Sequence, residues 1–312
     1  MISRALRIAA AGLIGLAGLA SAAFAADPSW KADVPEIRIG ILGSENSGGG
    51  LAEYNGFKSL LEKTFNVPVK LYPSSDYAGI MNAMAAGQVD ISLLGASSYA
   101  GLWLDCKCVE PMAVSIEKDG TPGYYSVLYV KADSPYQKLA DLKGKSLAFG
   151  DPNSTSGYLI PNFDLKDQGY DPASFFGSTG FSGGHEQSVI AVLKGQYDAG
   201  VGWSSQQGDI AQGFTTGVFH SMVGKGLLDM KQIRILWQSG LIPNSPWTVR
   251  SALPEAFRKD FTDFLMALPK EHHDIYVAVQ EGDGLGYKRV GRDFFEGIVK
   301  MREAQMQARR KS

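Results

Sequence analysis

Short apolar runs alternate with longer segments of helical spacing along the first third of the chain. The runs at Ile37–Leu42, 67–72 and 89–94 have the length and the residue types of buried strands. Segments 51–65 and 77–86 lie between them and carry apolar residues at near-helical spacing. Strands that alternate with helices in this way predict a parallel α/β unit.

The same construction returns in the second half of the chain. Gly87 ends the helix 77–86 just before a strand, and Gly195 does the same after a predicted helix at His185–Leu193. A helix–glycine–strand junction is common enough to recur by coincidence. However, the 312 residues exceed the size of one typical core. Together these features predict two α/β lobes of related construction.

The first 25 residues have the three parts of a secretory signal peptide. Arg4 and Arg7 supply the positive end, residues 8–20 are apolar, and Ala23-Phe24-Ala25 is a small-x-small cleavage site. The apolar run of ~13 residues is shorter than the ~20 that a membrane-spanning helix needs. We therefore predict an exported protein that is cleaved near Ala25, with an uncleaved anchor as the alternative.

Cleavage changes the charge balance. Lysine plus arginine falls from 30 to 28 while aspartate plus glutamate stays at 32, so the formal net charge goes from −2 to −4. A nucleic-acid-binding protein needs a basic footprint, and this composition argues against that class.

Three consecutive hydroxyls, Ser154-Thr155-Ser156, follow a predicted strand at Ser146–Phe149. One of them would be enough to cap the helix that begins there, and capping alone is the simpler interpretation. Three hydroxyls flanked by Gly150 and Gly157 exceed that need. No Lys/Arg cluster accompanies them, so we predict an anion site built from neutral donors and a helix N-terminus. Pro161 either lies in the first turn of this helix or kinks it.

Two further strand ends lead into predicted helix starts, at Ser75-Asp76-Tyr77 and at Gly183-Gly184-His185. Parallel α/β sheets bind ligands at the carboxyl ends of their strands. In a two-lobed protein the three helix starts can converge on the cleft between the lobes.

The cysteines and the enzyme-like motifs predict neither a metal site nor catalysis. Cys106 and Cys108 have no second pair and no nearby histidine, so a zinc site is disfavoured. A disulfide across one residue would be strained, although an oxidising compartment would allow it, and the spacing favours two thiols. Gly144-Lys145-Ser146 precedes a strand, whereas a phosphate-binding loop follows one. Residues 115–118 fit Ser-x-x-Lys but lie in a predicted strand without its partner motifs.

The octet Gly150-Asp151-Pro152-Asn153-Ser154-Thr155-Ser156-Gly157 resembles the phosphonate-binding periplasmic proteins of ABC importers, the PhnD family. Four further segments resemble the same family in register, from about residue 37 to about residue 251: residues 75–80, 119–128, 184–186 and 241–243. One short motif would be weak support, but five in order are specific.

The resemblance implies an α/β protein with the two-lobed type II periplasmic-binding-protein fold. The crossover strands would be 123–130 and 233–239. Lobe 1 would comprise residues 27–125 and 240–312, and lobe 2 would comprise residues 131–232. The resemblance also implies a set of residues that hold the phosphonate oxygens: Tyr77, Ser154, Thr155, Ser156 and His185. Ordinary packing for Tyr77 and a surface position for His185 are the alternatives.

The chain departs from the family on the other side of the ligand. Members that bind an aminoethyl group use carboxylates and a tyrosine where this chain has Ser205, Ser245 and Leu94. Trp203 and Trp247 could complete this distal pocket as an aromatic wall for an alkyl or ammonium group, or they could belong to the core.

Weak discrimination between amino- and alkylphosphonates is the resulting expectation, unless Glu45 or Glu186 reaches the amine from another wall. The function implied is that of a monomeric periplasmic receptor, without cofactor or metal. It would deliver a phosphonate, phosphite or a phosphate ester to an ABC permease in the inner membrane by lobe closure. The alternatives are a receptor for another oxyanion such as an alkyl sulfonate, or a secreted hydrolase of small phosphorus esters.

Overall fold

The computed structural model describes residues 29–42 and 50–311. The predicted signal peptide and Glu45 lie outside these residues. Within the described part of the chain, no helix combines the length and the apolar character needed to cross a membrane.

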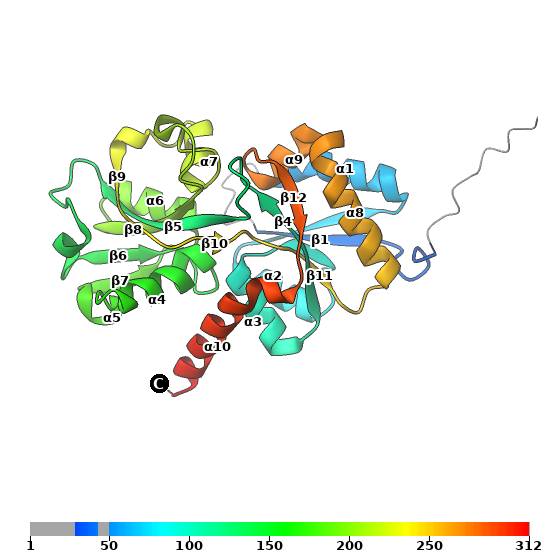
Figure 1. Ribbon diagram of the computed structural model, residues 1–312, viewed down its shortest axis with the longest axis horizontal. Coiled ribbons are helices and arrows are strands. Elements are labelled where there is room, and N and C mark those ends of the chain that lie inside the picture. Colours follow the sequence, from blue (N-terminus) through cyan, green and yellow to red (C-terminus); the bar gives the residue numbers. More distant parts are fainter. Residues whose placement is uncertain (1–28, 43–49, 312) are drawn as a thin grey trace, which may run out of the picture.

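Two six-stranded sheets lie side by side and form two lobes (Figure 1). The first sheet has the order β12-β4-β11-β3-β1-β2, and β1 pairs in parallel with β2 and β3. Its strands are β1 (Ile37–Leu42), β2 (Val69–Ser74), β3 (Ile91–Leu93), β4 (Val109–Ile116), β11 (Trp247–Arg250) and β12 (Gly286–Arg289). We call this sheet and its helices the first lobe.

Helices cover both faces of the first sheet because both faces are apolar. Phe57, Leu61 and Phe65 recur at helical spacing on α1 and pack with α8 and α9 against β1. On the other face, α2, α3 and α10 pack together around Tyr99 and Phe295. These helices are α1 (Gly50–Phe65), α2 (Tyr77–Ala85), α3 (Ala96–Cys106), α8 (Glu255–Glu271), α9 (His273–Gln280) and α10 (Glu296–Lys311).

The second lobe is built around the sheet β10-β5-β8-β6-β7, with β9 also paired to β5. Its strands are β5 (Gly123–Lys131), β6 (Ser146–Phe149), β7 (Ser178–Phe181), β8 (Ala199–Ser204), β9 (Ile233–Gln238) and β10 (Ile242–Pro243). One face carries α6 and α7, and the other carries α4 and α5. These are α4 (Ile160–Asp167), α5 (Pro172–Phe175), α6 (His185–Leu193) and α7 (Val218–Gly224).

The chain passes between the lobes twice in the described residues after β1: from β4 to β5 and from β10 to β11. The predicted two-lobed α/β fold is confirmed, and β1, β6 and α6 have the predicted limits. Both predicted crossover segments fall in strands that pair within the second sheet, and β10 adds residues beyond 239 to that sheet. The lobe limits at 125, 131, 232 and 240 therefore stay a proposal.

The two cysteines are joined, contrary to the prediction of two thiols. Cys106 ends α3, and Lys107 then adopts a left-handed conformation with φ of 54°. This turn brings the Cα atoms of Cys106 and Cys108 to 5.0 Å, and a disulfide links the side chains. The separation lies within the usual range for a bridge, so the tight turn removes the obstacle that the short spacing suggested.

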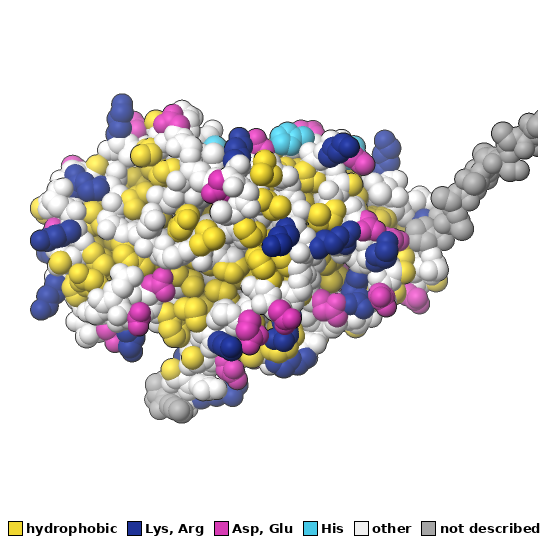
Figure 2. Space-filling model, viewed as in Figure 1, with side chains coloured by type: hydrophobic (Ala, Val, Ile, Leu, Met, Phe, Trp, Pro, Cys, Tyr) yellow, Lys and Arg dark blue, Asp and Glu magenta, His cyan; other side chains and the backbone are white. Residues whose placement is uncertain are grey.

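Acidic and basic side chains are mixed over the face of the molecule shown in Figure 2. Interspersed charges of both signs on a surface favour solubility.

Candidate functional site

The hydroxyl segment begins a helix by a wide turn. Ser154 is the N-cap, and its Oγ accepts a hydrogen bond from the Gly157 N–H at 3.0 Å. Residues Thr155–Leu159 form one π-helical turn, which continues into α4. Such turns are common at functional sites because they widen the helix and re-aim side chains.

Pro161 lies in the first turn of α4, the first of the two predicted alternatives. Proline has no N–H, so it leaves the carbonyl groups of the preceding turn without a helical donor. The Gly157 carbonyl accepts from the Gly150 N–H at 2.9 Å instead, and the Ser156 carbonyl accepts from Ser126 Oγ at 2.7 Å. The turn is thereby fixed to the second sheet.

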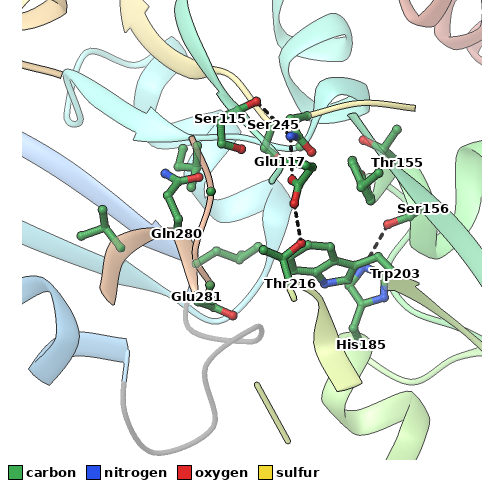
Figure 3. Close-up of a pocket in the computed structure, with 18 of the residues that line it drawn as sticks. Ser115, Glu117, Thr155, Ser156, His185, Trp203, Thr216, Ser245, Gln280 and Glu281 are labelled. Carbon is green, nitrogen blue, oxygen red and sulfur yellow. Dashed lines mark hydrogen bonds between the residues drawn. The ribbon is translucent and has the colours of Figure 1, made fainter. Parts of the chain in front are cut away.

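The predicted oxygen-binding residues meet at one cavity of about 140 Å³ between the lobes. Tyr77 is the first residue of α2 in the first lobe, whereas His185 is the first residue of α6 in the second. The Ser154 Oγ lies 3.2 Å from His185 Nε2 and 3.5 Å from the Tyr77 hydroxyl. Ser156 Oγ lies 3.5 Å from His185 Nε2 (Figure 3). The five predicted residues, Tyr77, Ser154, Thr155, Ser156 and His185, all line this cavity.

Hydrogen bonds tie the hydroxyl segment to the opposite lobe. The Ser97 N–H, at the start of α3, donates to Thr155 Oγ1 at 2.8 Å, and Ser98 Oγ donates to the Asn153 carbonyl at 3.0 Å. Buried Arg302 on α10 donates to the Pro152 carbonyl at 3.2 Å and also to the Asn153 side chain. Burial lowers the pKa of Arg302. The hydroxyl segment is therefore held against α3 and α10 of the first lobe.

The predicted distal residues are divided between the cavity and the core. Trp203 and Ser245 line the cavity, and Trp203 meets Tyr124 edge-on at 5.4 Å between ring centroids. The remaining three, Leu94, Ser205 and Trp247, are buried and do not line it.

Trp247 lies in the core of the first lobe, which was the second of the two positions predicted for it, and not in a wall of the cavity. It packs between Phe57 and Phe261, and its Nε1 donates to the Tyr287 hydroxyl. Glu186 is also buried outside the cavity lining, where it forms an ion pair with Lys225 at 2.8 Å.

Glu117 is one of the cavity residues that the sequence analysis did not single out as ligand-binding groups. It follows directly after β4, and its side chain points into the cavity between Ser245 and Thr216 (Figure 3). Its Oε1 accepts from Asn244 Nδ2 and its Oε2 accepts from Thr216 Oγ1, both at 2.9 Å. Burial raises the pKa of Glu117, the two hydrogen bonds oppose that rise, and Asp119 adds to it. The sequence feature that could have identified Glu117 as a cavity residue is its position, an acidic residue at the carboxyl end of an apolar strand.

The loop after α9 forms another wall of the cavity. Gln280, Glu281 and Asp283 line it there. Asp283 is paired with Lys118 at 3.0 Å and lies 3.4 Å from His273, and its pKa is lowered. Acidic groups therefore gather on the side of the cavity away from the hydroxyl segment.

Two α/β lobes with a polar cavity between them define a periplasmic solute-binding protein. Residues 39–286 match the family of periplasmic substrate-binding proteins of phosphonate ABC transporters. The chain belongs to this family, as its motifs predicted.

Two relatives of known identity match most of the chain. One is the phosphate-import protein PhnD of Mycolicibacterium smegmatis, 33% identical over 237 residues, which are 73% of this chain and 70% of that protein. The other is the phosphonates-binding periplasmic protein of Escherichia coli, 32% identical over 234 residues, which are 74% of this chain and 65% of that protein.

Solved structures agree with the fold. A binding protein of an ABC phosphonate transporter from Pseudomonas aeruginosa superimposes with a TM-score of 0.73 at 25% identity, over 86% of this chain and 85% of that chain. A Prochlorococcus marinus protein in complex with methylphosphonate gives a TM-score of 0.74 at 19% identity, over 87% and 98% of the two chains. At 19% identity, the similarity to the Prochlorococcus marinus protein concerns the fold alone.

Proposed function

We propose that this protein binds a phosphonate in the cavity through Tyr77, Ser154, Thr155, Ser156 and His185. The lobes close around the ligand, and the closed receptor delivers it to an ABC permease in the inner membrane. The observation that carries the proposal is the convergence of these donors, one from the first lobe and four from the second, on one cavity.

The hydrogen bonds of the hydroxyl segment support this use. Ser154 Oγ already accepts from Gly157, and Thr155 Oγ1 already accepts from Ser97. Because both hydroxyl oxygens already accept a hydrogen bond, the protons of the Ser154 and Thr155 hydroxyls can be donated to a ligand. The three oxygens of a phosphonate are strong acceptors, and hydrogen bonds to charged groups are the stronger kind. The site thus suits a tetrahedral oxyanion, although no lysine or arginine is among the described residues of the lining.

Closure follows from the contacts between the lobes. Bonds such as Ser97 to Thr155 join α3 to the hydroxyl segment and exist only when the lobes meet. A ligand that contacts Tyr77 on one lobe and Ser154 on the other binds the closed state better than the open one. Its differential affinity shifts the population toward the closed state.

Inorganic phosphate is the second candidate, because the relative from M. smegmatis is a phosphate-import protein. The cavity favours a phosphonate or a phosphate ester over bare phosphate. It extends past the oxyanion donors to Tyr124, Trp203 and Glu117, a space that phosphate would leave empty. Its volume, about 140 Å³, is close to that of an engineered cavity that holds benzene, so the substituent should be small.

A thermal-shift screen followed by calorimetry tests the proposal. The panel comprises methyl-, ethyl- and aminoethylphosphonate, phosphite, phosphate and ethanesulfonate. A ligand that binds only the folded protein raises the melting temperature. We expect a phosphonate to give the largest shift and to be recovered unchanged after incubation. A larger shift with phosphate or sulfonate would overturn the proposal, and turnover of a phosphorus ester would favour a hydrolase.

Export and oligomeric state have their own tests. We expect the mature protein from the periplasmic fraction to begin near residue 26, which N-terminal sequencing measures. Light scattering during size-exclusion chromatography should give the mass of a monomer. An intact N-terminus in the membrane fraction would instead indicate an anchor.

A further inference from the structure

We propose that Glu117 selects phosphonates that carry an ammonium group on their substituent. The inference rests on the proposed function and concerns the other end of the same cavity. It names a specificity-determining residue at a position other than the serines and the leucine that match the amine-binding positions of the family.

Glu117 is a buried carboxylate that faces the ligand cavity without a cationic partner among the described residues. Its side chain is 4% exposed. Its two hydrogen-bond donors, Asn244 and Thr216, are neutral. The neighbouring Lys118 pairs with Asp283 instead. An ionised carboxylate in such surroundings is costly unless an opposite charge accompanies it, so the missing cation is supplied by the ligand.

The carboxylate is held in place for this task. Asn244 Nδ2 also donates to the Ser115 carbonyl at 3.0 Å, which fixes the amide that orients Oε1. Each carboxylate oxygen has about two acceptor positions, and the structure uses one on each. The remaining positions can accept N–H groups. A primary ammonium therefore fits better than a quaternary one, which has no N–H to donate.

Glu117 also acts against other ligands. A phosphonate without an ammonium group brings negative charge into a cavity that already holds a carboxylate. Glu117 must then either remain as an unpaired buried charge or take up a proton, and both lower the affinity. Selection of this kind rejects alkylphosphonates as well as attracting aminoalkyl ones. Ser205, Ser245 and Leu94 led us to expect weak discrimination between amino- and alkylphosphonates. The position of Glu117 leads to the opposite expectation, a clear preference for aminoalkylphosphonates.

Recognition of the ammonium group by Glu117 depends on closure of the two lobes. Thr216 lies between β8 and α7 of the second lobe, whereas Glu117 belongs to the first lobe. Thr216 also forms an isolated β-bridge with Gly282, next to the acidic wall. The donor that completes the Glu117 site is therefore in place only when the lobes meet.

Calorimetry with 2-aminoethylphosphonate and ethylphosphonate at one pH and ionic strength tests the inference. We expect the wild-type protein to prefer the amine by at least about tenfold in dissociation constant. Glu117→Gln keeps the shape and one acceptor but removes the charge. It should cut the preference by about tenfold or more and should leave ethylphosphonate bound at least as tightly. Glu303→Gln, the same change at an exposed position on α10 outside the cavity lining, should keep the wild-type preference.

The outcomes separate the two proposals. Binding of both compounds with a preference below about tenfold, or an equal preference in Glu117→Gln, would overturn the role of Glu117 and leave the proposed function standing. Binding of neither compound would overturn the proposed function together with this inference. If Glu117→Gln does not fold, Thr216→Val takes its place. It removes one donor to the carboxylate, so it should also lower the preference, and an unchanged preference would count against the inference.

Discussion

The three hydroxyls have different structural duties, so replacing them singly separates binding from folding. Ser154 caps the helical turn and Thr155 accepts from the opposite lobe, whereas among the described residues Ser156 Oγ forms a hydrogen bond only with His185 Nε2, at 3.5 Å. Ser156→Ala therefore removes one of the proposed ligand donors and leaves the cap and the contact between the lobes in place. A hydrogen bond to a charged group contributes about 1.5–3 kcal/mol, and 1.4 kcal/mol corresponds to a factor of ten. We expect the dissociation constant to rise about 10- to 100-fold.

The same reasoning predicts a different result for Ser154→Ala. Loss of the cap leaves the Gly157 N–H without its acceptor, and the unfolding free energy should fall by about 1 kcal/mol. Affinity should fall as well. For Ser156→Ala, by contrast, the ligand-free protein should unfold in urea within about 0.5 kcal/mol of wild type.

Calorimetry with the tightest-binding phosphonate and urea unfolding of the ligand-free protein give both quantities. Ser174→Ala is the matched control, because this serine is exposed on α5 and lies outside the cavity lining. It should change neither measurement. A folded Ser156→Ala protein that binds within about threefold of wild type would refute the assignment of Ser156 as a ligand donor.

Three further predictions concern single side chains. Burial raises the pKa of Glu117 in the folded protein above its ordinary 4.5, so the stabilising contribution of the protonated side chain is present below pH 4.5 and is lost as pH rises through the folded pKa. Glu117→Gln should therefore raise the melting temperature of the ligand-free protein at pH 8 but not at pH 4. An equal change in melting temperature at both pH values would contradict this. Arg302→Lys should weaken phosphonate binding about tenfold by releasing Pro152 and Asn153, and unchanged affinity in calorimetry would show that the segment is held without Arg302. His185→Ala removes a side chain whose Nε2 lies 3.2 Å from Ser154 Oγ, so the phosphonate should bind about tenfold more weakly; unchanged affinity in calorimetry would exclude His185 as a ligand donor.

Local patterns, together with the family resemblance, were sufficient to predict that the residues proposed to hold the oxyanion meet at one cavity. The Ser-Thr-Ser segment, the cap of α2 and the start of α6 depend on residues within a few positions of each other. Strand ends and helix starts are determined by such neighbours, so the converging donors could be predicted with their residue numbers. The disulfide depended on a single backbone conformation, at Lys107, that the composition of the turn does not specify.

The substituent end could not be predicted because it is assembled from distant segments. Glu117 meets Thr216 and Asn244, which are 99 and 127 positions away in the chain. Trp247 turns into the core because β11 lies between β3 and β4, and that pairing decides which way its side chains point. The residues next to Glu117 and Trp247 in the sequence indicate neither the contacts of Glu117 nor the orientation of Trp247.

The buried carboxylate also bears on how an empty receptor behaves. Closing the lobes without a ligand would bury Glu117 between Asn244 and Thr216 with no cation beside it. Neutral hydrogen bonds between the lobes contribute about 1 kcal/mol each, whereas an unpaired buried charge costs several. In the closed state without a ligand, Glu117 must therefore carry that penalty or take up a proton, and under the role proposed for Glu117 an ammonium-bearing ligand would remove the penalty as it binds. Each unit by which the pKa is raised corresponds to about 1.4 kcal/mol, so the stability difference predicted for Glu117→Gln measures the penalty that Glu117 imposes on the folded, ligand-free protein.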